Sequence, residues 1–186
     1  QAEDGIRDLV RSRGLGDVYK RQSYKPTEKK ITNYKPHENS NVWIVDLIIT
    51  DNEAVTVENA LRQKGFEVKV SKQTHWEISC SKNSTSTLKQ IDDSGELYNS
   101  NKEYLSDLPE EKETISVLIR QKEDVHCQKK FDSLTQRFKI RDLLQLKRGV
   151  VWNITIKNAN FSSIFNDILD TNILHNPLSH ECFRIS

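Results

Sequence analysis

The feature of this sequence that most constrains its fold is an internal repeat. Residues 42–104 and 115–183 carry short matching motifs in the same order, spaced about 72–77 residues apart. The matched motifs are Phe66-Glu67-Val68 with Phe138-Lys139-Ile140, Trp76-Glu77-Ile78 with Trp152-Asn153-Ile154, and Asp93-Ser94 with Asp170-Thr171. The last pair continues as Leu97-Tyr98-Asn99-Ser100 and Leu174-His175-Asn176-Pro177, which keeps the spacing D-[ST]-x-x-L-x-N. A solenoid needs at least three copies, so two copies favour a duplicated small domain packed as a pseudo-dimer.

The N-terminal residues differ in character from the rest of the chain. Residues 1–22 hold three of the six glycines and resemble translated sequencing-adapter sequence, although a charged natural N-terminus is an alternative. We leave them out of the fold argument and expect the natural N-terminus to be missing. Residues 23–38 contain two Tyr-Lys-Pro steps, which favour a linker over a basic-aromatic contact arm. We therefore expect residues 1–38 to be a disordered tail and linker.

Charge and cysteine usage narrow the class of protein. Five Lys or Arg and four Asp or Glu lie in residues 1–22, so the remainder carries 23 of each sign. This balance argues against a nucleic-acid partner, which would select for excess positive charge. Cys80, Cys127 and Cys182 are odd in number and widely spaced, which suits a reduced, cytoplasmic protein. No run approaches the ~18 apolar residues of a membrane span, so we expect no membrane association.

Hydrophobic periodicity predicts the elements of the first copy. The apolar run 42–49 is typical of a central strand, and Thr50-Asp51 can cap a helix that ends near Gly65. Residues 66–70 and 74–80 each alternate apolar with polar residues and are expected to pair as a hairpin. A short helix is expected around Leu88 and Ile91.

The second copy repeats this order with other residues. A strand is expected at 115–120, and a helix presents Cys127, Phe131 and Leu134 on one face. Strands at 138–146 and 150–156 are expected to be joined by a hairpin turn at Gly149. A strongly amphipathic helix at 161–169 and an edge strand at 182–185 complete the copy.

These elements define an α+β fold of two tandem βαββα(β) units with antiparallel sheets packed as a pseudo-dimer. The units are expected at residues 39–108 and 109–186, with the polar segment 99–113 as their boundary. A single unit of about 65 residues has a marginal core and bare sheet edges, which a second copy can cover.

The sequence holds no convincing catalytic, metal or cofactor motif. The glycines outside the N-terminal tail do not form a phosphate-binding loop, and His126-Cys127 and His180-x-Cys182 lack the spacing of a zinc site. We expect no catalytic residue, no metal and no cofactor. An independent enzyme is therefore a less favoured interpretation than a protein that assembles with partners or binds a regulatory ligand.

Six residues are candidates for an interface. Asp46 interrupts an apolar strand, either as an edge gatekeeper, which is favoured, or as a satisfied interface charge. Asp142 is expected to play the corresponding part in the second copy. Trp76 and Trp152 occupy equivalent positions and either fill the core, which is favoured, or anchor an interface. Asn176 and Pro177 complete the set.

The order of motifs resembles the PurS family, the small component of phosphoribosylformylglycinamidine synthase in purine biosynthesis. The matches in the first copy are Asp51 through Leu61, Gly65-Phe66-Glu67-Val68 and Trp76-Glu77-Ile78, and those in the second are Ile168-Leu169 and Ile173-Leu174-His175-Asn176-Pro177-Leu178. Together the two copies cover about 140 residues. The D-P-x-G of the family is replaced by Asp51-Asn52-Glu53-Ala54 and by Glu123-Asp124-Val125.

The resemblance implies a βαββαβ unit and a non-catalytic role in an ATP-dependent amide ligase. PurS-like components dimerise and bridge the synthetase and glutaminase components, and they help ammonia pass between them. A tandem pair would supply both halves of that dimer, and the chain would be an N-terminal fragment of a longer synthetase. The alternative is a tandem ACT-like regulatory domain that binds a small metabolite, against which the glycine-free turn Thr50-Asp51-Asn52-Glu53 counts.

Overall fold

The computed structural model of the chain describes residues 31–81, 84–110, 113–156 and 161–185. The expectations for residues 1–22 and 23–30 lie outside this part. Residues 31–38 differ from the expected disordered linker, because they lie against the sheet. Thr32–Asn33 (β1) pairs with the C-terminal strand, and the Tyr34 N–H donates a hydrogen bond of 2.8 Å to the carbonyl oxygen of Arg184.

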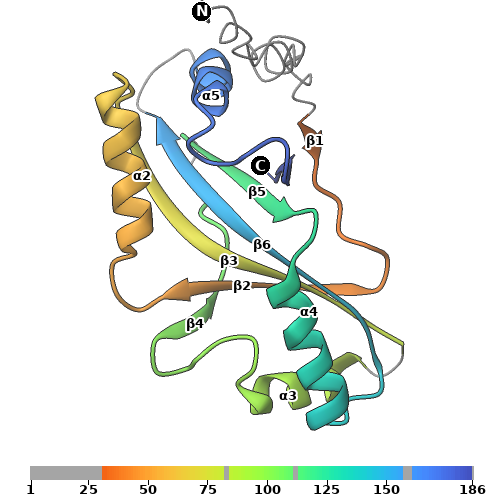
Figure 1. Cartoon of the computed structure of the whole chain (residues 1–186). Helices are drawn as coiled ribbons and strands as arrows, with labels where there is room; N and C mark the ends of the chain where they lie inside the picture. The colour runs from red at the N-terminus through yellow and green to blue at the C-terminus, as the bar shows by residue number, and fades with distance from the viewer. Residues whose placement is uncertain (1–30, 82–83, 111–112, 157–160, 186) are drawn as a thin grey trace, which may run out of the picture.

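Within the described residues, seven strands form one sheet in the order β1-β7-β5-β6-β3-β2-β4 (Figure 1). The remaining strands are β2 Ser40–Leu47, β3 Val68–Cys80, β4 Glu103–Ser106, β5 Thr114–Gln121, β6 Leu143–Ile156 and β7 His180–Arg184. The helices are α2 Asn52–Gln63, α3 Ser84–Ser94, α4 Val125–Asp132, which continues as the π-helix η1 Ser133–Arg137, and α5 Phe161–Asp170. All strand pairs except β1 with β7 are antiparallel, so the expected α+β class is confirmed.

Each half of the chain has the order β-α-β-α-β, which is β2-α2-β3-α3-β4 followed by β5-α4-β6-α5-β7. The predicted hairpins are wrong, because β3 and β6 are single strands of 13 and 14 residues. The segment expected to be only a boundary contains β4, and the expected C-terminal edge strand lies between β5 and β1. Figure 1 shows β3 and β6 running side by side across the whole molecule.

Polar residues in the middle of β3 explain why the sequence suggests a hairpin there. Gln73, His75 and Glu77 interrupt the apolar pattern, yet each is at most 5% exposed. They face away from the helices, so the second face of this strand is both polar and covered. The segment 147–149, expected to be a turn, lies inside β6 opposite residues 75–77.

The two tryptophans lie in related positions. Trp76 pairs with Arg148, and Trp152 pairs with Lys72, so each lies two residues beyond the Thr74–Val150 pair on its own strand. A two-fold axis through that pair exchanges the two strands and the two tryptophans, since antiparallel pairing has this symmetry.

The four helices cover one face of the sheet over two separate cores. The first core packs α2 and α5 on the ends of β3 and β6, and includes Leu61, Val70, Trp152, Ile154 and Ile168. The second packs α3 and α4 on the other ends, and includes Trp76, Ile78, Ile91, Leu134 and Leu146. Each core therefore combines one helix from each half, and neither half has a complete core of its own.

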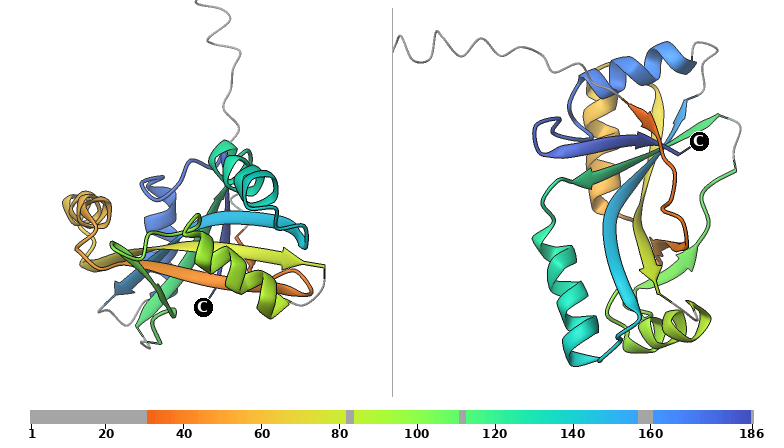
Figure 2. Two further views of the ribbon diagram at one scale, coloured as in Figure 1. Left: turned by 90° about the horizontal axis from the view of Figure 1, so that it is seen from below. Right: turned by 90° about the vertical axis from the view of Figure 1, so that its right-hand side faces the viewer.

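Extended segments cover the opposite face. We call residues 31–40 the arm; it crosses this face together with residues 106–108, on the side away from α2 and α4 (Figure 2, right). Side chains from these segments and from β7 pack on three buried residues of the sheet: Tyr34, Leu108, Phe183 and Ile185 contact Ile44, Leu118 and Val151.

The repeated D-[ST]-x-x-L-x-N motif forms the same turn twice. Asn99 accepts a hydrogen bond from the N–H of Asn101 through its side chain, and its carbonyl oxygen accepts from Lys102 and Glu103. Asn176 makes the equivalent three contacts with Leu178, Ser179 and His180. Ser94 and Thr171 likewise each donate to the carbonyl oxygen three residues earlier, and Gly95 and Asn172, which follow them, both have positive φ. Each turn delivers the chain into the last strand of its half.

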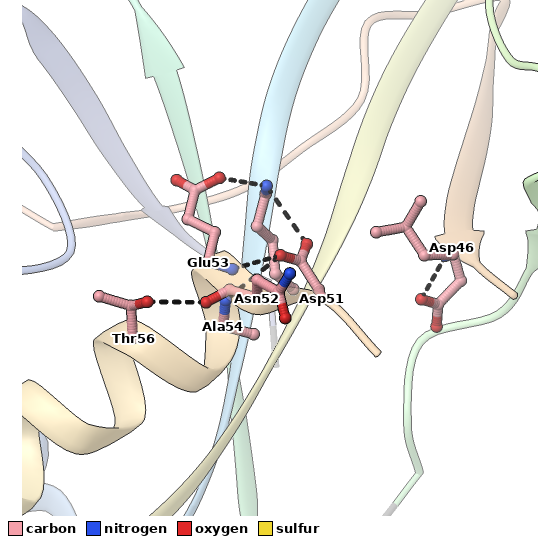
Figure 3. Close-up of polar contacts among 8 residues, drawn as sticks. Asp46, Asp51, Asn52, Glu53, Ala54 and Thr56 are labelled. Atoms are coloured by element: carbon pink, nitrogen blue, oxygen red, sulfur yellow. Dashed lines mark hydrogen bonds and ion pairs between the residues drawn. The ribbon is translucent and has the colours of Figure 1, made fainter. Parts of the chain in front are cut away.

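The helix after the first strand begins as expected. The carboxylate of Asp51 accepts hydrogen bonds from the N–H groups of Glu53 and Ala54, at 2.7 and 3.3 Å (Figure 3). Lys72 on β3 forms ion pairs with both Asp51 and Glu53, which ties the start of α2 to the sheet. These contacts satisfy helix N–H groups that would otherwise lack a partner.

Candidate functional site

The clearest candidate site lies where two neighbouring strands separate. The β5–β6 ladder ends at the Ile119–Val150 pair. Beyond it β5 stays paired with β7 as far as Gln121, while β6 stays paired with β3 as far as Leu143. We call the resulting gap between β5 and β6 the open fork.

A cavity of about 540 Å³ occupies the open fork. It is lined by the arm, the end of β5, the first turn of α4, and residues of β6 and β7. Such a volume lies within the usual range for small-molecule sites.

Gly149 allows β5 to lie close against β6 at the base of this fork. A Cβ added to Gly149 would lie 2.4 Å from Cδ1 of Leu118, 3.0 Å from the carbonyl oxygen of Ile119 and 3.1 Å from Cγ of Arg120. The stem of Arg120 therefore packs directly over the backbone of β6, and a glycine inside a strand often marks this kind of close approach. Gly149 serves packing here, in place of the expected hairpin turn.

Glu77 is the acidic centre of the site and is only 2% exposed. Its carboxylate accepts hydrogen bonds from the Arg120 guanidinium at 2.7 Å, the Tyr34 hydroxyl at 2.8 Å and the His37 N–H at 3.0 Å. Burial alone would raise the pKa of Glu77, but these three donors together lower it to about 2. The group is ionised and fully engaged at neutral pH, so it is poorly suited to act as a general base.

Arg120 joins the sheet to the arm. Besides its ion pair with Glu77, its guanidinium carbon lies 5.3 Å from the ring centre of Tyr34 and 5.9 Å from that of Phe183. Such cation–π contacts are stabilising, particularly when they are shielded from water. Burial and the bond to Glu77 raise the pKa of Tyr34 above its ordinary value, so its hydroxyl remains a donor.

His75 lies fully buried beneath Tyr34, with the two rings edge to face at 5.1 Å and 88°. Within the described residues neither of its ring nitrogens has a hydrogen-bond partner. Burial and the positive charge of Arg120 lower the pKa of His75 to about 4, so the ring is neutral at physiological pH.

The cavity lining carries more positive than negative charge. Lys35, Arg120, Lys122, Lys147 and Arg148 contribute five cations, and Glu77, Asp124 and Glu181 contribute three carboxylates. Arg120 is paired with Glu77, and Arg148 lies 4.0 Å from Asp124. The half-buried Lys147 side chain has no hydrogen bond or ion pair within the described part of the chain.

A second fork, at the two-fold-related place, is filled. The β2–β3 ladder ends at the Val45–Thr74 pair, after which β2 continues beside β4. Gln73 stands one residue before Thr74, as Gly149 stands one residue before Val150. Its side chain occupies this gap, which we call the plugged fork.

Hydrogen bonds hold the side chain of Gln73 in the plugged fork. Its amide nitrogen donates to Asp46 at 3.2 Å, to Ser106 at 3.4 Å and to the carbonyl oxygen of Asp107 at 3.2 Å. Its amide oxygen accepts from Asn153 at 2.9 Å, and Asn153 in turn accepts from the hydroxyl of Ser116 at 2.6 Å. The same backbone arrangement is therefore closed at one end of the sheet and hollow at the other.

The two predicted acidic residues lie apart. The edge-gatekeeper interpretation of Asp46 is wrong, because β2 has partners on both sides. The Asp46 carboxylate accepts a hydrogen bond from the N–H of Leu47 (Figure 3). It also accepts one from the side chain of Gln73. Asp142 precedes β6 and accepts from the hydroxyl of Ser81 at 2.8 Å. It does not correspond to Asp46, since the residue in the equivalent place is Arg120, one position past the last β5 residue that pairs with β6.

The other predicted residues serve the fold. Trp76 and Trp152 are 2% and 4% exposed in the two helix-covered cores, which agrees with the favoured core interpretation. Asn176 and Pro177 belong to the turn before β7. The structure thus brings none of the six candidates together, and only Asp46 reaches either fork.

The candidate thiols and histidines form no cluster. Cys127 donates to the carbonyl oxygen of Leu146 at 3.4 Å, and burial, with the nearby carboxylate of Asp124, raises its thiol pKa to about 11. His126 is exposed, and Nδ1 of His180 accepts from the N–H of Asn176. Within residues 31–81, 84–110, 113–156 and 161–185, no three His, Cys, Asp or Glu side chains are placed to hold a metal ion.

Sequence reasoning missed Tyr34, Glu77 and Arg120. The only local signal was that Glu77 falls between two apolar residues, Trp76 and Ile78, in a strand whose other face could be covered. Glu77 and its partners on the arm and β5 are about 40 residues apart, and no spacing rule connects such distant positions.

Comparison with known proteins does not assign a family. No model of a known protein family matches the sequence, and no curated protein matches it significantly. Among the described helices, none has the length and apolar character needed to cross a membrane.

Proposed function

We propose that this chain is a non-catalytic assembly domain of phosphoribosylformylglycinamidine synthase, which bridges the synthetase and glutaminase components. The observation that carries the proposal is the joining of two halves of equal element order in one sheet through β3 and β6. A chain built in this way would supply both halves of the dimer that PurS-like components form.

The residues behind the resemblance have structural roles in both halves. Gly65, at φ +93°, ends α2 and leads into β3, and Asn176 shapes the turn into β7. The βαββαβ order attached to the resemblance is not what either half has, since one long strand takes the place of each hairpin. The proposal therefore rests on the pairing of the halves and on these turns.

The chemistry of the open fork supports a non-catalytic role. Glu77 is ionised and held by three donors, while the hydroxyl of Tyr34 and the thiol of Cys127 keep their protons. A general acid or base works best with a pKa near the ambient pH, and these groups are shifted away from it. Their contacts hold the arm on the sheet.

A tandem ACT-like regulatory domain remains the second candidate, because the open fork is a cavity of metabolite size. The cavity lies at the turn after β5, the first strand of the second half, and not at the glycine-free turn after β2, the first strand of the first half. That turn is occupied by the capping contacts of Asp51. We therefore rank this candidate below the assembly domain. For either function we propose a cytoplasmic location.

A reconstitution assay tests the assembly role. A synthetase and a glutaminase that lack their own small component are mixed with this chain, and amide formation is measured with glutamine and with ammonia. We expect a stable ternary complex in gel filtration and a rise in glutamine-dependent activity, with ammonia-dependent activity unchanged. Absence of a complex together with no change in glutamine-dependent activity would overturn the proposal.

Matched surface variants would locate the contact. Leu105→Lys lies on the bare edge strand β4 and Leu178→Lys lies near β7, and these leucines are 44% and 60% exposed, so neither change should unfold the chain. Loss of the complex with one variant alone assigns the contact to that end of the sheet, and loss with neither places it elsewhere.

A further inference from the structure

We propose that the open fork binds a small molecule through its phosphate monoester group. The site is the 540 Å³ cavity between β5 and β6, bounded by the arm and the start of α4. This inference is independent of the assembly role, because it rests only on the geometry and charge of the fork.

The first argument is the contrast between the two forks. The plugged fork is filled by Gln73, whose amide groups meet their partners inside the protein. The two-fold-related position in the open fork is Gly149, where Leu118 and Arg120 pack against the backbone in place of a side chain, and the cavity adjoins Arg120. A protein interior is normally packed without such gaps, so a hollow lined by polar groups indicates a place for a ligand.

The second argument is the charge of the lining, which has five cations and three carboxylates. An excess of two positive charges matches a phosphate monoester, which carries between about 1.5 and 2 negative charges at pH 7. Arg120 is fixed by Glu77 and by the aromatic rings, so its remaining N–H groups are pre-oriented. Planar guanidinium groups bind phosphate oxygens in pairs.

The third argument is Lys147, which pairs with Glu77 across β3 and β6 and is half-buried. It has no hydrogen bond or ion pair with any other described residue. A lysine ammonium group that has no partner in the protein is free to pair with a bound anion. Leu146 and Phe183 add apolar surface beside these cations, which suits a ligand with a hydrophobic body.

The experiment uses the full chain and three probes. Inorganic phosphate tests the head group, phenyl phosphate adds an aromatic body, and phthalate is a dicarboxylate of similar charge. Binding is followed by titration calorimetry and by amide chemical shifts. We expect phenyl phosphate to bind with a Kd below about 1 mM, tighter than inorganic phosphate and at least fivefold tighter than phthalate. The shifts should lie at the arm, the end of β5 and residues 146–149.

Paired variants make the proposal falsifiable. Lys147→Gln removes the unpaired cation and should weaken phenyl phosphate binding at least fivefold, whereas the control Lys102→Gln, on an exposed residue near β4, should leave it within twofold. Both variants should have the wild-type unfolding midpoint. No binding up to about 10 mM, or equal losses in the two variants, overturns the site. Phthalate binding as tight as phenyl phosphate overturns the phosphate assignment.

Discussion

The two forks of the sheet have the same backbone arrangement and opposite contents. In each, the neighbouring strand leaves a central strand at the equivalent position, after the Val45–Thr74 pair or the Ile119–Val150 pair. The plugged fork places a neutral amide among hydrogen-bond partners, with Asp46 at its rim. The open fork places Arg120 where Asp46 would stand and a glycine where Gln73 would stand. One end of the molecule is therefore completed by its own side chains, and the other is left able to accept a ligand.

The largest effect is expected from removing the buried charge at the open fork. Glu77→Leu leaves Arg120 buried without its carboxylate, and should lower the free energy of unfolding by about 3–5 kcal/mol in urea denaturation. Gln73→Leu at the plugged fork removes hydrogen bonds but no ion pair, and should cost about 1–3 kcal/mol. The double variant Glu77→Leu/Arg120→Met should recover much of the loss. Equal costs for the two single variants would contradict the difference between the forks.

The pH dependence of stability should be dominated by the same end of the molecule. The folded pKa of His75 is lowered to about 4, so the unfolded state binds more protons below pH 6.5 and stability falls as pH drops from 6.5 to 4. The folded pKa of Glu77 is also lowered, to about 2, so its contribution is lost between pH 4.5 and 2. Each shift corresponds to roughly 3 kcal/mol.

Urea midpoints measured across this range separate the two groups. His75→Phe should flatten the dependence between pH 6.5 and 4 and leave the dependence below pH 4.5 in place. If the variant keeps the wild-type slope above pH 4.5, His75 is not the group that titrates there.

A smaller effect is expected from a side chain at Gly149, where β5 lies close against β6. Gly149→Ala puts a methyl group 2.4 Å from Leu118, which must shift, and overpacking of this kind costs about 1–3 kcal/mol. Thermal unfolding of Gly149→Ala and of the control Gly95→Ala distinguishes crowding from backbone strain. Gly95 has open space but a φ of +62°, so its cost should come from backbone strain alone, at about 1 kcal/mol. A Gly149→Ala protein as stable as the wild type would show that this fork has spare room.

The smallest effects are expected at the repeated turns. Asn99→Ala and Asn176→Ala each remove one exposed side-chain hydrogen bond, to Asn101 and Leu178 respectively, and should each cost about 0.5–1 kcal/mol. Equal losses of unfolding free energy in chemical denaturation would show that the two turns are equivalent in energy as well as in geometry. A difference greater than about 1 kcal/mol would show that the turns differ in importance.

The sequence predicted the parts of the fold that have local signals. The helix after Asp51 follows from its cap, and the helix at 161–169 follows from apolar periodicity. The motifs matched in the sequence form matched turns at Asn99 and Asn176, although the turns themselves were not predicted. The two hairpins were wrong because buried polar residues interrupt the alternation in β3 and because Gly149 is a turn signal used for close packing.

The site could not be predicted in the same way. Tyr34 contacts Glu77 from a segment whose Tyr-Lys-Pro motifs predict a linker. The residues next to Glu77 in the sequence give no indication that the arm covers it. The importance of Gly149 depends on Leu118 and Arg120, which approach it only because β5 crosses it in the sheet. These are long-range contacts, and periodicity carries no information about them.

The pairing of β3 with β6 also bears on how fast the chain can fold. It places Val68 opposite Ile156. Neither helix-covered core can form before this pairing, because each core contains one helix from each half. Closing so long a loop before any core is complete costs chain entropy, and proteins dominated by distant contacts fold slowly. We expect the nascent first half to remain without stable structure until the second has left the ribosome.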